Sequence, residues 1–314
     1  MEQKTNRIVP TPYDDVFRTL LNDCRSLIIP VINEIFGCTY TGNEQVVLAP
    51  DIHFLNQQDG REEKRITDSS FRIVDVWGEK KFLCECQSIA DNSMLVRIFE
   101  YATQIALDQG TLEGDTLNVD IPHCAVLFLR SNRNTPEKMR IAMKTPGGSV
   151  SFDVPVMKTQ KYSVDEIFEK RLLFLLPFYI FSHESRFGEY EGNPDKLEML
   201  KKEYADITER LNRLVETGAV SVYMAKTIIE MSEKVVENIA RKYGHVKEGV
   251  KSVMGGRILE YEAKTILNEG RMEQAKETAT KLHMIGMDEK TIAEMVNGVC
   301  QVKCVSFSKN ISER

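Results

Sequence analysis

The chain has 314 residues, of which 42% are hydrophobic and 28% charged, and this composition is typical of an ordinary globular protein with one or two domains. Its formal net charge of −6 at pH 7 argues against an extended, non-specific DNA-binding surface, because such surfaces are usually basic. The longest apolar run, Leu172 to Phe181, is too short to span a bilayer, so we expect a buried helix there and no membrane partner.

Two further features indicate the compartment. No apolar segment follows the polar stretch Met1 to Arg7, so the sequence predicts no signal peptide. Seven cysteines, an odd number without framework spacing, are typical of a reducing compartment, and we expect the cytoplasm. Cys300 and Cys304 have no second pair of Cys or His ligands nearby, which argues against a zinc site.

The first elements expected along the chain are a helix, a strand and a hairpin. Residues 14–36 have a helical apolar stripe that Pro30 should kink or interrupt, and Val46 to Leu55 is typical of a strand. In Arg65–Ile73 and again in Lys81–Ser88, polar and apolar residues alternate with period two. This alternation predicts two paired strands, with a turn at Gly78-Glu79-Lys80.

A helix and two strands complete the expected α/β core. Asp91 or Ser93 is expected to cap the helix. Its apolar stripe consists of Leu95, Ile98, Phe99, Ala102, Ile105 and Ala106, and its other face carries Arg97, Tyr101, Gln104 and Asp108. Ile121–Arg130 and Ser149–Lys158 are typical of strands.

Beyond about residue 160 the pattern is helical only. Ser163 and Glu166 have the spacing of a capping box, and Pro194 should open a long helix through Val215. Residues 219–243 and 249–268 predict two more helices. We therefore expect a first domain over residues 10–185 and a helical C-terminal region over 186–314.

The expected hairpin carries the residues most relevant to chemistry. Because side chains alternate along a strand, Phe82, Cys84 and Cys86 share one face, and Leu83, Glu85 and Gln87 share the other. The two cysteines are expected to be small core residues. A hairpin of this length can bring Asp68 beside Glu85, and two converging carboxylates suit Mg²⁺ or Mn²⁺ and phosphodiester hydrolysis. A solvated hairpin with surface acids is the alternative.

A resemblance favours the metal site. Asp68, the segment Glu85-Cys86-Gln87-Ser88 and the segment Met94 to Tyr101 together resemble the PD-(D/E)xK nuclease-family transposases, the recombination-promoting nuclease family. The likeness begins at Tyr13-Asp14-Asp15-Val16-Phe17-Arg18 and continues through Tyr162–Lys170 to Leu172–Tyr179. The combination is more specific than any single motif.

The resemblance implies a restriction-endonuclease-like α/β core of PD-(D/E)xK type, followed by an all-helical C-terminal region. It implies a metal-dependent DNA endonuclease of transposase or recombination-promoting type, in which Asp68 and Glu85 bind the metal. Gln87 stands where the family commonly has Lys. A Gln amide cannot act as a general base, but it can hold a water molecule by hydrogen bonds.

Further residues are expected around this site. Glu34 or Asp15 would add an acid, as an acid from the first helix does in related nucleases. Arg97 and Tyr101, one helical turn apart, would contact a phosphate, with a surface ion pair to Glu100 or Asp108 as the alternative. A basic cluster would meet the DNA backbone unless it is a solvated loop; its members are Arg130, Arg133, Lys138, Arg140 and Lys144.

The end of the chain departs from the family. Glu273–Met284 and Glu289–Met295 resemble the first two helices of a helix-turn-helix, but Cys300–Phe307 shows no helical periodicity, so a plain helical hairpin is favoured. This departure and the missing Lys keep open an alternative function, a catalytically inactive nucleic-acid- or protein-binding module with the same fold. A homodimer is compatible with double-strand cleavage, which needs two active sites or two visits.

Overall fold

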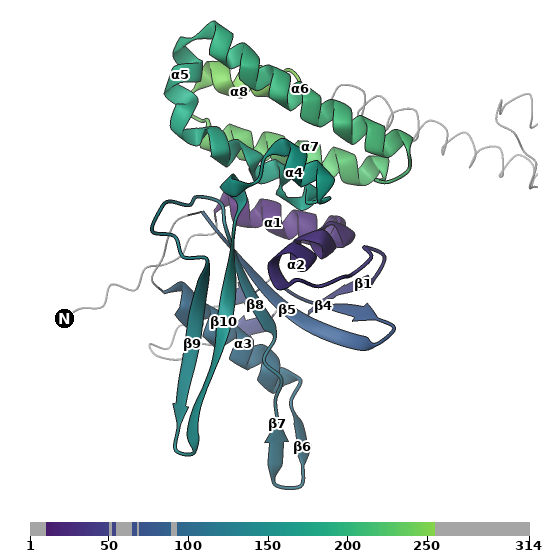
Figure 1. Cartoon of the computed structure of the whole chain (residues 1–314), viewed down its shortest axis with the longest axis vertical. Coiled ribbons are helices and arrows are strands. Elements are labelled where there is room, and N and C mark those ends of the chain that lie inside the picture. The colour runs from purple at the N-terminus through teal and green to yellow at the C-terminus, as the bar shows by residue number, and fades with distance from the viewer. Residues whose placement is uncertain (1–10, 50–51, 55–64, 68, 89–92, 255–314) are drawn as a thin grey trace, which may run out of the picture. The chain divides into compact units, whose positions relative to one another are not determined.

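A six-stranded mixed sheet lies at the centre of the computed structural model, which describes residues 11–49, 52–54, 65–67, 69–88 and 93–254. The strand order is β1 (Gln45–Leu48), β4 (Ser70–Asp75), β5 (Gly78–Gln87), β8 (His123–Phe128), β10 (Gly148–Lys158) and β9 (Lys138–Thr145), as Figure 1 shows. The three strands β5, β8 and β10 are parallel, and the other pairs are antiparallel. The carboxyl ends of the parallel strands therefore meet at one edge, where open α/β sheets usually bind ligands. The expected α/β class is confirmed.

Helices cover both faces of this sheet. One face carries Leu83, Val126 and Val154, which pack against α3 (Met94–Asp108) in a buried apolar cluster. The other face carries Phe82, whose ring contacts Phe36 of α2 (Ile28–Phe36), with ring centroids 5.5 Å apart. The helix α1 (Pro12–Asp23) also packs on β5. The core is thus a helix–sheet–helix sandwich (Figure 1).

The first helical segment differs from the prediction. Residues 14–36 were expected to form one helix kinked at Pro30, but α1 ends at Asp23 and a 3₁₀ turn, η1 (Arg25–Leu27), separates it from α2. Pro30 lies in the first turn of α2, where a missing backbone N–H leaves no hydrogen bond unmade. Thr11 and Asp14 form a capping box that starts α1.

The expected hairpin is also corrected. Only β4 pairs with β5, whereas β3 (Arg65–Thr67) pairs with β2 (Ile52–Phe54) in a separate two-stranded sheet. The predicted strand Val46–Leu55 is therefore divided between β1 and β2. The hairpin turns at Val76 and Trp77 instead of Gly78–Lys80, because the register pairs Asp75 with Gly78.

The structure contains strands that periodicity did not reveal. Residues 138–145 form β9, which extends the sheet by pairing with β10 along its length, so Lys138, Arg140 and Lys144 lie on a strand and not in a solvated loop. A short hairpin of β6 (Thr111–Glu113) and β7 (Thr116–Asn118) follows α3. Both hairpins are visible in the lower half of Figure 1.

Helices and turns make up the second half of the described chain, residues 159–254. Its elements are η2 (Thr159–Lys161), α4 (Val164–Glu169), η3 (Leu173–Arg186), α5 (Phe187–Gly192), α6 (Pro194–Glu216), α7 (Val222–Ile239) and α8 (Gly244–Lys251). The Ser163–Glu166 capping box and the start at Pro194 are confirmed. The apolar run Leu172–Phe181 is buried, but its helix η3 is of the 3₁₀ type.

These helices pack on the rest of the fold. The helix α7 contacts both α1 and η3, and the described residues belong to one compact unit. The expected boundary at residues 185–186 stays a prediction. Among the described residues, no helix combines the length and the apolar character needed to cross a membrane. The tail expected to resemble a helix-turn-helix lies outside the described residues.

Candidate active site

Glu85 and Gln87 lie side by side on one face of β5, as the alternation predicts. Glu85 is in register with Val126 and Gln87 with Phe128, so both side chains lie on the sheet face that α3 covers. Both are only partly buried, and so they remain accessible to a ligand. The backbone oxygen of Gln87 accepts a hydrogen bond of 2.8 Å from the amide of Leu129, which fixes the end of β5 against the chain that follows β8.

Asp68 lies outside the described residues, so its expected contact with Glu85 stays a prediction. Its sequence neighbour Ser69 is described. The Ser69 hydroxyl donates to Glu85 Oε1 at 3.1 Å, and the Ser69 carbonyl accepts from the Cys84 amide at 3.0 Å. The segment that enters β4 therefore reaches the carboxylate of Glu85.

The described residues test only part of the expected metal site. No group of three or more His, Cys, Asp or Glu side chains among them could hold a metal ion. Mg²⁺ needs fewer protein ligands, since it often binds one or two carboxylates together with waters and phosphate oxygens. Glu85 supplies one such carboxylate, and the amide oxygen of Gln87 is a second hard donor on the same face.

Arg97 and Tyr101 lie on the same side of the sheet as Glu85, because both belong to α3. Their side chains were expected on the polar face of the helix, but only 7% of Arg97 and 8% of Tyr101 is exposed. Tyr101 belongs to the apolar cluster with Leu83, and Asp108 accepts from Gln104. Arg97 is therefore buried and does not lie on the surface, and its expected contacts stay a prediction. A guanidinium buried between α3 and the sheet is better suited to stabilise their packing than to bind an exposed phosphate.

The structure does not bring Glu34 or Asp15 to Glu85. Both lie on helices that cover the opposite face of the sheet. Glu34 Oε1 accepts from Lys170 at 2.6 Å and from the Tyr162 hydroxyl at 3.1 Å. Asp15 lies 3.4 Å from Lys234 Nζ. These contacts tie the two acids to the helical part of the chain.

The cysteines of β5 have a packing role, as expected. Cys84 and Cys86 are buried on the face opposite Glu85. Burial raises the pKa of both thiols well above the usual value, and it raises the pKa of Cys124 to about 12. Neutral thiols are poor nucleophiles and poor metal ligands, so these side chains act as small apolar groups.

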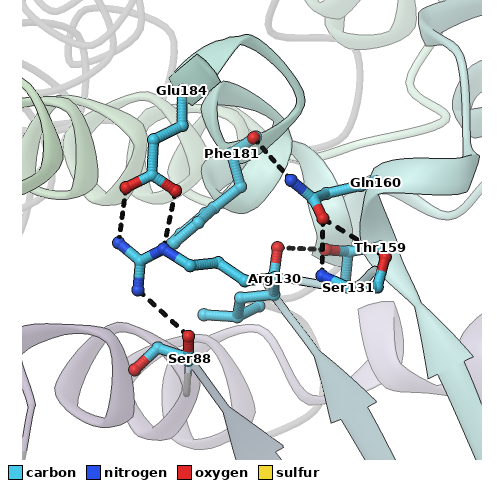
Figure 2. A network of polar contacts seen from close by, with 8 residues as sticks. Ser88, Arg130, Ser131, Thr159, Gln160, Phe181 and Glu184 are labelled. Atoms are coloured by element: carbon cyan, nitrogen blue, oxygen red, sulfur yellow. Dashed lines mark hydrogen bonds and ion pairs between the residues drawn. The ribbon is translucent and has the colours of Figure 1, made fainter. Parts of the chain in front are cut away.

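Arg130 lies at the carboxyl ends of the parallel strands, in the network of Figure 2. Its guanidinium makes two bonds to the Glu184 carboxylate, of 2.6 and 2.8 Å, and a third of 3.0 Å to the Ser88 carbonyl. It also lies over the ring of Phe181, 4.8 Å from the centroid. These contacts connect the end of β5 to η3 and use most of the donors that a phosphate would need.

A second set of bonds closes the same edge. The Gln160 side chain accepts from the Ser131 amide at 2.6 Å and donates to the Phe181 carbonyl at 2.7 Å (Figure 2). The Thr159 hydroxyl donates to the Phe128 carbonyl at 3.2 Å. The edge expected to meet DNA through Arg130 is therefore joined to η3 by side chains.

The other basic residues lie away from Glu85. Lys138 and Arg140 face away from α3, because Met139 and Ile141 of the same strand pack toward it. Both are bonded to Asp153, at 2.6 and 2.7 Å, and the hydrogen bonds from Arg140 and Lys138 lower the pKa of Asp153 to about 2. Arg133 is exposed between β8 and β9. A ligand on this face would not touch Gln87.

Three partners of the site were not anticipated from the sequence: Ser69, Ser88 and Glu184. Ser69 could have been inferred from its place after Asp68, but nothing local to Glu184 indicates that it pairs with an arginine 54 residues earlier. Comparisons with protein-family models, with curated proteins and with solved structures find no match.

Proposed function

We propose that the protein is a metal-dependent DNA endonuclease with a PD-(D/E)xK-type core, as the sequence resemblance implies. The observation that carries the proposal is that Glu85 and Gln87 lie side by side on the accessible part of β5. The Ser69 hydroxyl donates a hydrogen bond to the Glu85 carboxylate. The order helix, antiparallel strands, helix and parallel strand in the described chain supports the proposal. The words transposase and recombination come from the resemblance alone.

The proposal assigns a role to each residue. It requires the Asp68 carboxylate to lie beside that of Glu85, which the contact of its sequence neighbour Ser69 with Glu85 supports. Asp68 and Glu85 would then hold Mg²⁺ or Mn²⁺, which neutralises charge on the phosphate and lowers the pKa of a bound water. The Gln87 amide orients the attacking water in line with the phosphorus. Ser69 keeps the Glu85 carboxylate in position.

A plasmid-nicking assay tests the proposal. We expect the parent protein to convert supercoiled plasmid to open circles with Mg²⁺ or Mn²⁺ and to stop when a chelator is added. Glu85→Gln and Asp68→Asn should each lose at least about 100-fold in rate, since each removes a charge that acts on the developing transition state. Glu113→Gln, at an exposed acid of the β6–β7 hairpin, is the matched control and should cut like the parent.

Two outcomes would contradict the proposal. Parental rates for both Glu85→Gln and Asp68→Asn would show that cleavage occurs elsewhere or comes from a contaminant. No cleavage of plasmid, linear or single-stranded DNA with either metal would favour the binding module without catalysis.

A further inference from the structure

The turn between β4 and β5 exposes two large apolar side chains. Val76 is 92% exposed and Trp77 is 93% exposed, and Trp77 is the only tryptophan of the chain. Tryptophan is rarely so exposed, because its burial removes a large apolar area from water. Figure 1 shows the β4–β5 hairpin ending at the right-hand side of the sheet.

Folding does not require these two residues. Asp75 Oδ1 accepts from the Trp77 amide at 2.7 Å, which forms an Asx turn. Gly78 follows with φ of +135°, a conformation that side chains with a Cβ rarely adopt. Asp75 and Gly78 thus supply the turn geometry, and polar residues at positions 76 and 77 would serve equally well. The apolar pair is therefore available for a ligand.

Positive charge lies between this turn and Glu85. Arg72 and Lys81 are direct cross-strand partners, and alternation places both on the face of Glu85. Like charges directly opposite one another destabilise a sheet. Glu79 offsets one of them through a 3.0 Å bond to Arg72. An anionic ligand along this face would offset the other.

The three features follow one another along a single hairpin. Trp77 precedes Glu85 by eight residues, a distance of roughly 26 Å at about 3.3 Å per residue. That length corresponds to about eight steps of a strand whose bases stay stacked as in a duplex, at ~3.4 Å each. Aromatic side chains bind bases by stacking, and cations between them bind the phosphates. An anionic lipid surface would also use the apolar turn and the cations, but it would give no reason for them to lie on the hairpin that carries Glu85.

We propose that the β4–β5 turn is a contact for single-stranded or unpaired DNA, with Trp77 stacked on a base and Lys81 on a backbone phosphate. The proposal rests on the proposed function, because it takes DNA to be the ligand of the hairpin that carries Glu85. It adds a binding element that the resemblance does not assign. Val76 would pack against the sugar or the neighbouring base.

Tryptophan fluorescence tests this directly, since Trp77 is the only emitter of its kind. The full chain is titrated with a mixed-sequence single-stranded oligonucleotide in the presence of a chelator, so that binding is measured without cleavage. We expect saturable quenching, because stacking on a base changes the environment of the indole. A labelled oligonucleotide in a parallel anisotropy titration gives the affinity.

Variants separate stacking from charge. Trp77→Ala should weaken binding by about 5- to 100-fold, the loss expected for one base–aromatic stack, whereas Trp77→Phe should restore most of it. Lys81→Gln should weaken binding and reduce the salt dependence by about one phosphate contact. Tyr223→Ala removes another exposed aromatic side chain, on α7, and should bind like the parent. Thermal unfolding confirms that each variant is folded.

Several results would overturn the inference. They are an absence of DNA binding, binding that leaves the fluorescence unchanged, or parental affinity in Trp77→Ala. A response to phosphatidylserine-containing vesicles alone would assign the turn to a membrane, and self-association lost in Trp77→Ala would assign it to a second copy. Quenching of the Trp77 fluorescence by DNA without plasmid cleavage would contradict the proposed catalysis but support the DNA contact at the turn. Plasmid cleavage with no change in Trp77 fluorescence would keep the proposed catalysis and remove the contact.

Discussion

At the scale of single residues, Gln87 decides whether the site resembles a working nuclease. Its backbone is fixed by the bond from Leu129, and its side chain shares the accessible face with Glu85. A fixed backbone lowers the entropy that the amide must lose to hold a water molecule, which favours preorganised catalysis.

Substitution of Gln87 tests this role. We expect Gln87→Leu to slow single-turnover cleavage by about 100-fold, the usual loss of one preorganised hydrogen-bond donor. Gln87→Lys should cut at the parental rate or faster, because an ammonium reaches the same space and attracts developing negative charge. Equal rates in the parent and in both variants would remove Gln87 from the mechanism.

Alternation along β5 was enough to predict which of its residues share a face, because the period of a strand is fixed by its backbone. It correctly separated Glu85 and Gln87 from the buried Cys84 and Cys86. The same logic failed on α3, where Arg97 and Tyr101 are buried despite their polar groups. A helix covered by a sheet buries more than its apolar stripe, and only the tertiary contacts reveal how much.

At the scale of elements, turns and edge strands were the least predictable. The two central residues of the turn, Val76 and Trp77, are not of the types that favour turns. The flanking Asp75 carboxylate and Gly78 determine its geometry instead. The strand β9 carries alternating cations and apolar residues, but its pairing with β10 is what makes it a strand. Capping at Ser163 and Pro194 was predictable because those signals are local.

The Arg130–Glu184 pair joins the segment that follows β8 to η3. The coupling free energy of the two side chains can be measured. The two side chains are 34% and 32% exposed, so their coupling should fall between the values for surface and buried pairs. We expect a coupling free energy of about 1 to 2 kcal/mol from a cycle of Arg130→Met, Glu184→Gln and the double variant. Urea denaturation gives the free energies of unfolding.

The control for that cycle is the pair of Lys138 and Asp153. Its bond is as short, at 2.6 Å, but the lysine side chain is 63% exposed. Lys138→Met and Asp153→Asn should therefore show a smaller coupling than Arg130 and Glu184, and one that decreases further at high salt. A coupling at Arg130 no larger than this control would mean that the network of Figure 2 does not stabilise the edge of the sheet.

At the scale of the whole molecule, the sheet and the helices after it form one unit. The apolar face of α7 carries the buried residues Ile228, Ile229, Val235 and Val236, and this helix packs on α1 and η3. The rings of Phe17 and Phe174 meet edge to face, with centroids 5.1 Å apart, and join α1 to η3 in turn. The sequence predicted these helices but not their position, because amphipathic periodicity does not identify the surface that a helix covers.

Truncation tests how far this unit extends. A chain that ends at Gly255 keeps every described helix, so we expect one cooperative transition and a melting temperature close to that of the full chain. A chain that ends at residue 185 loses α7. Burial of four aliphatic side chains is worth about 6 to 12 kcal/mol, comparable to the whole stability of a domain, so the shorter chain should unfold or aggregate.

Calorimetry and near-ultraviolet circular dichroism on the two truncations provide the measurement. A cooperative transition in the chain that ends at residue 185 would show that the boundary expected from the sequence is an independent folding unit and that α7 is an appendage. Loss of cooperativity in the chain that ends at Gly255 would show instead that later residues belong to the core. The expected pair of results, a folded longer chain and an unfolded shorter one, makes α7 part of the scaffold that holds α1 against β5.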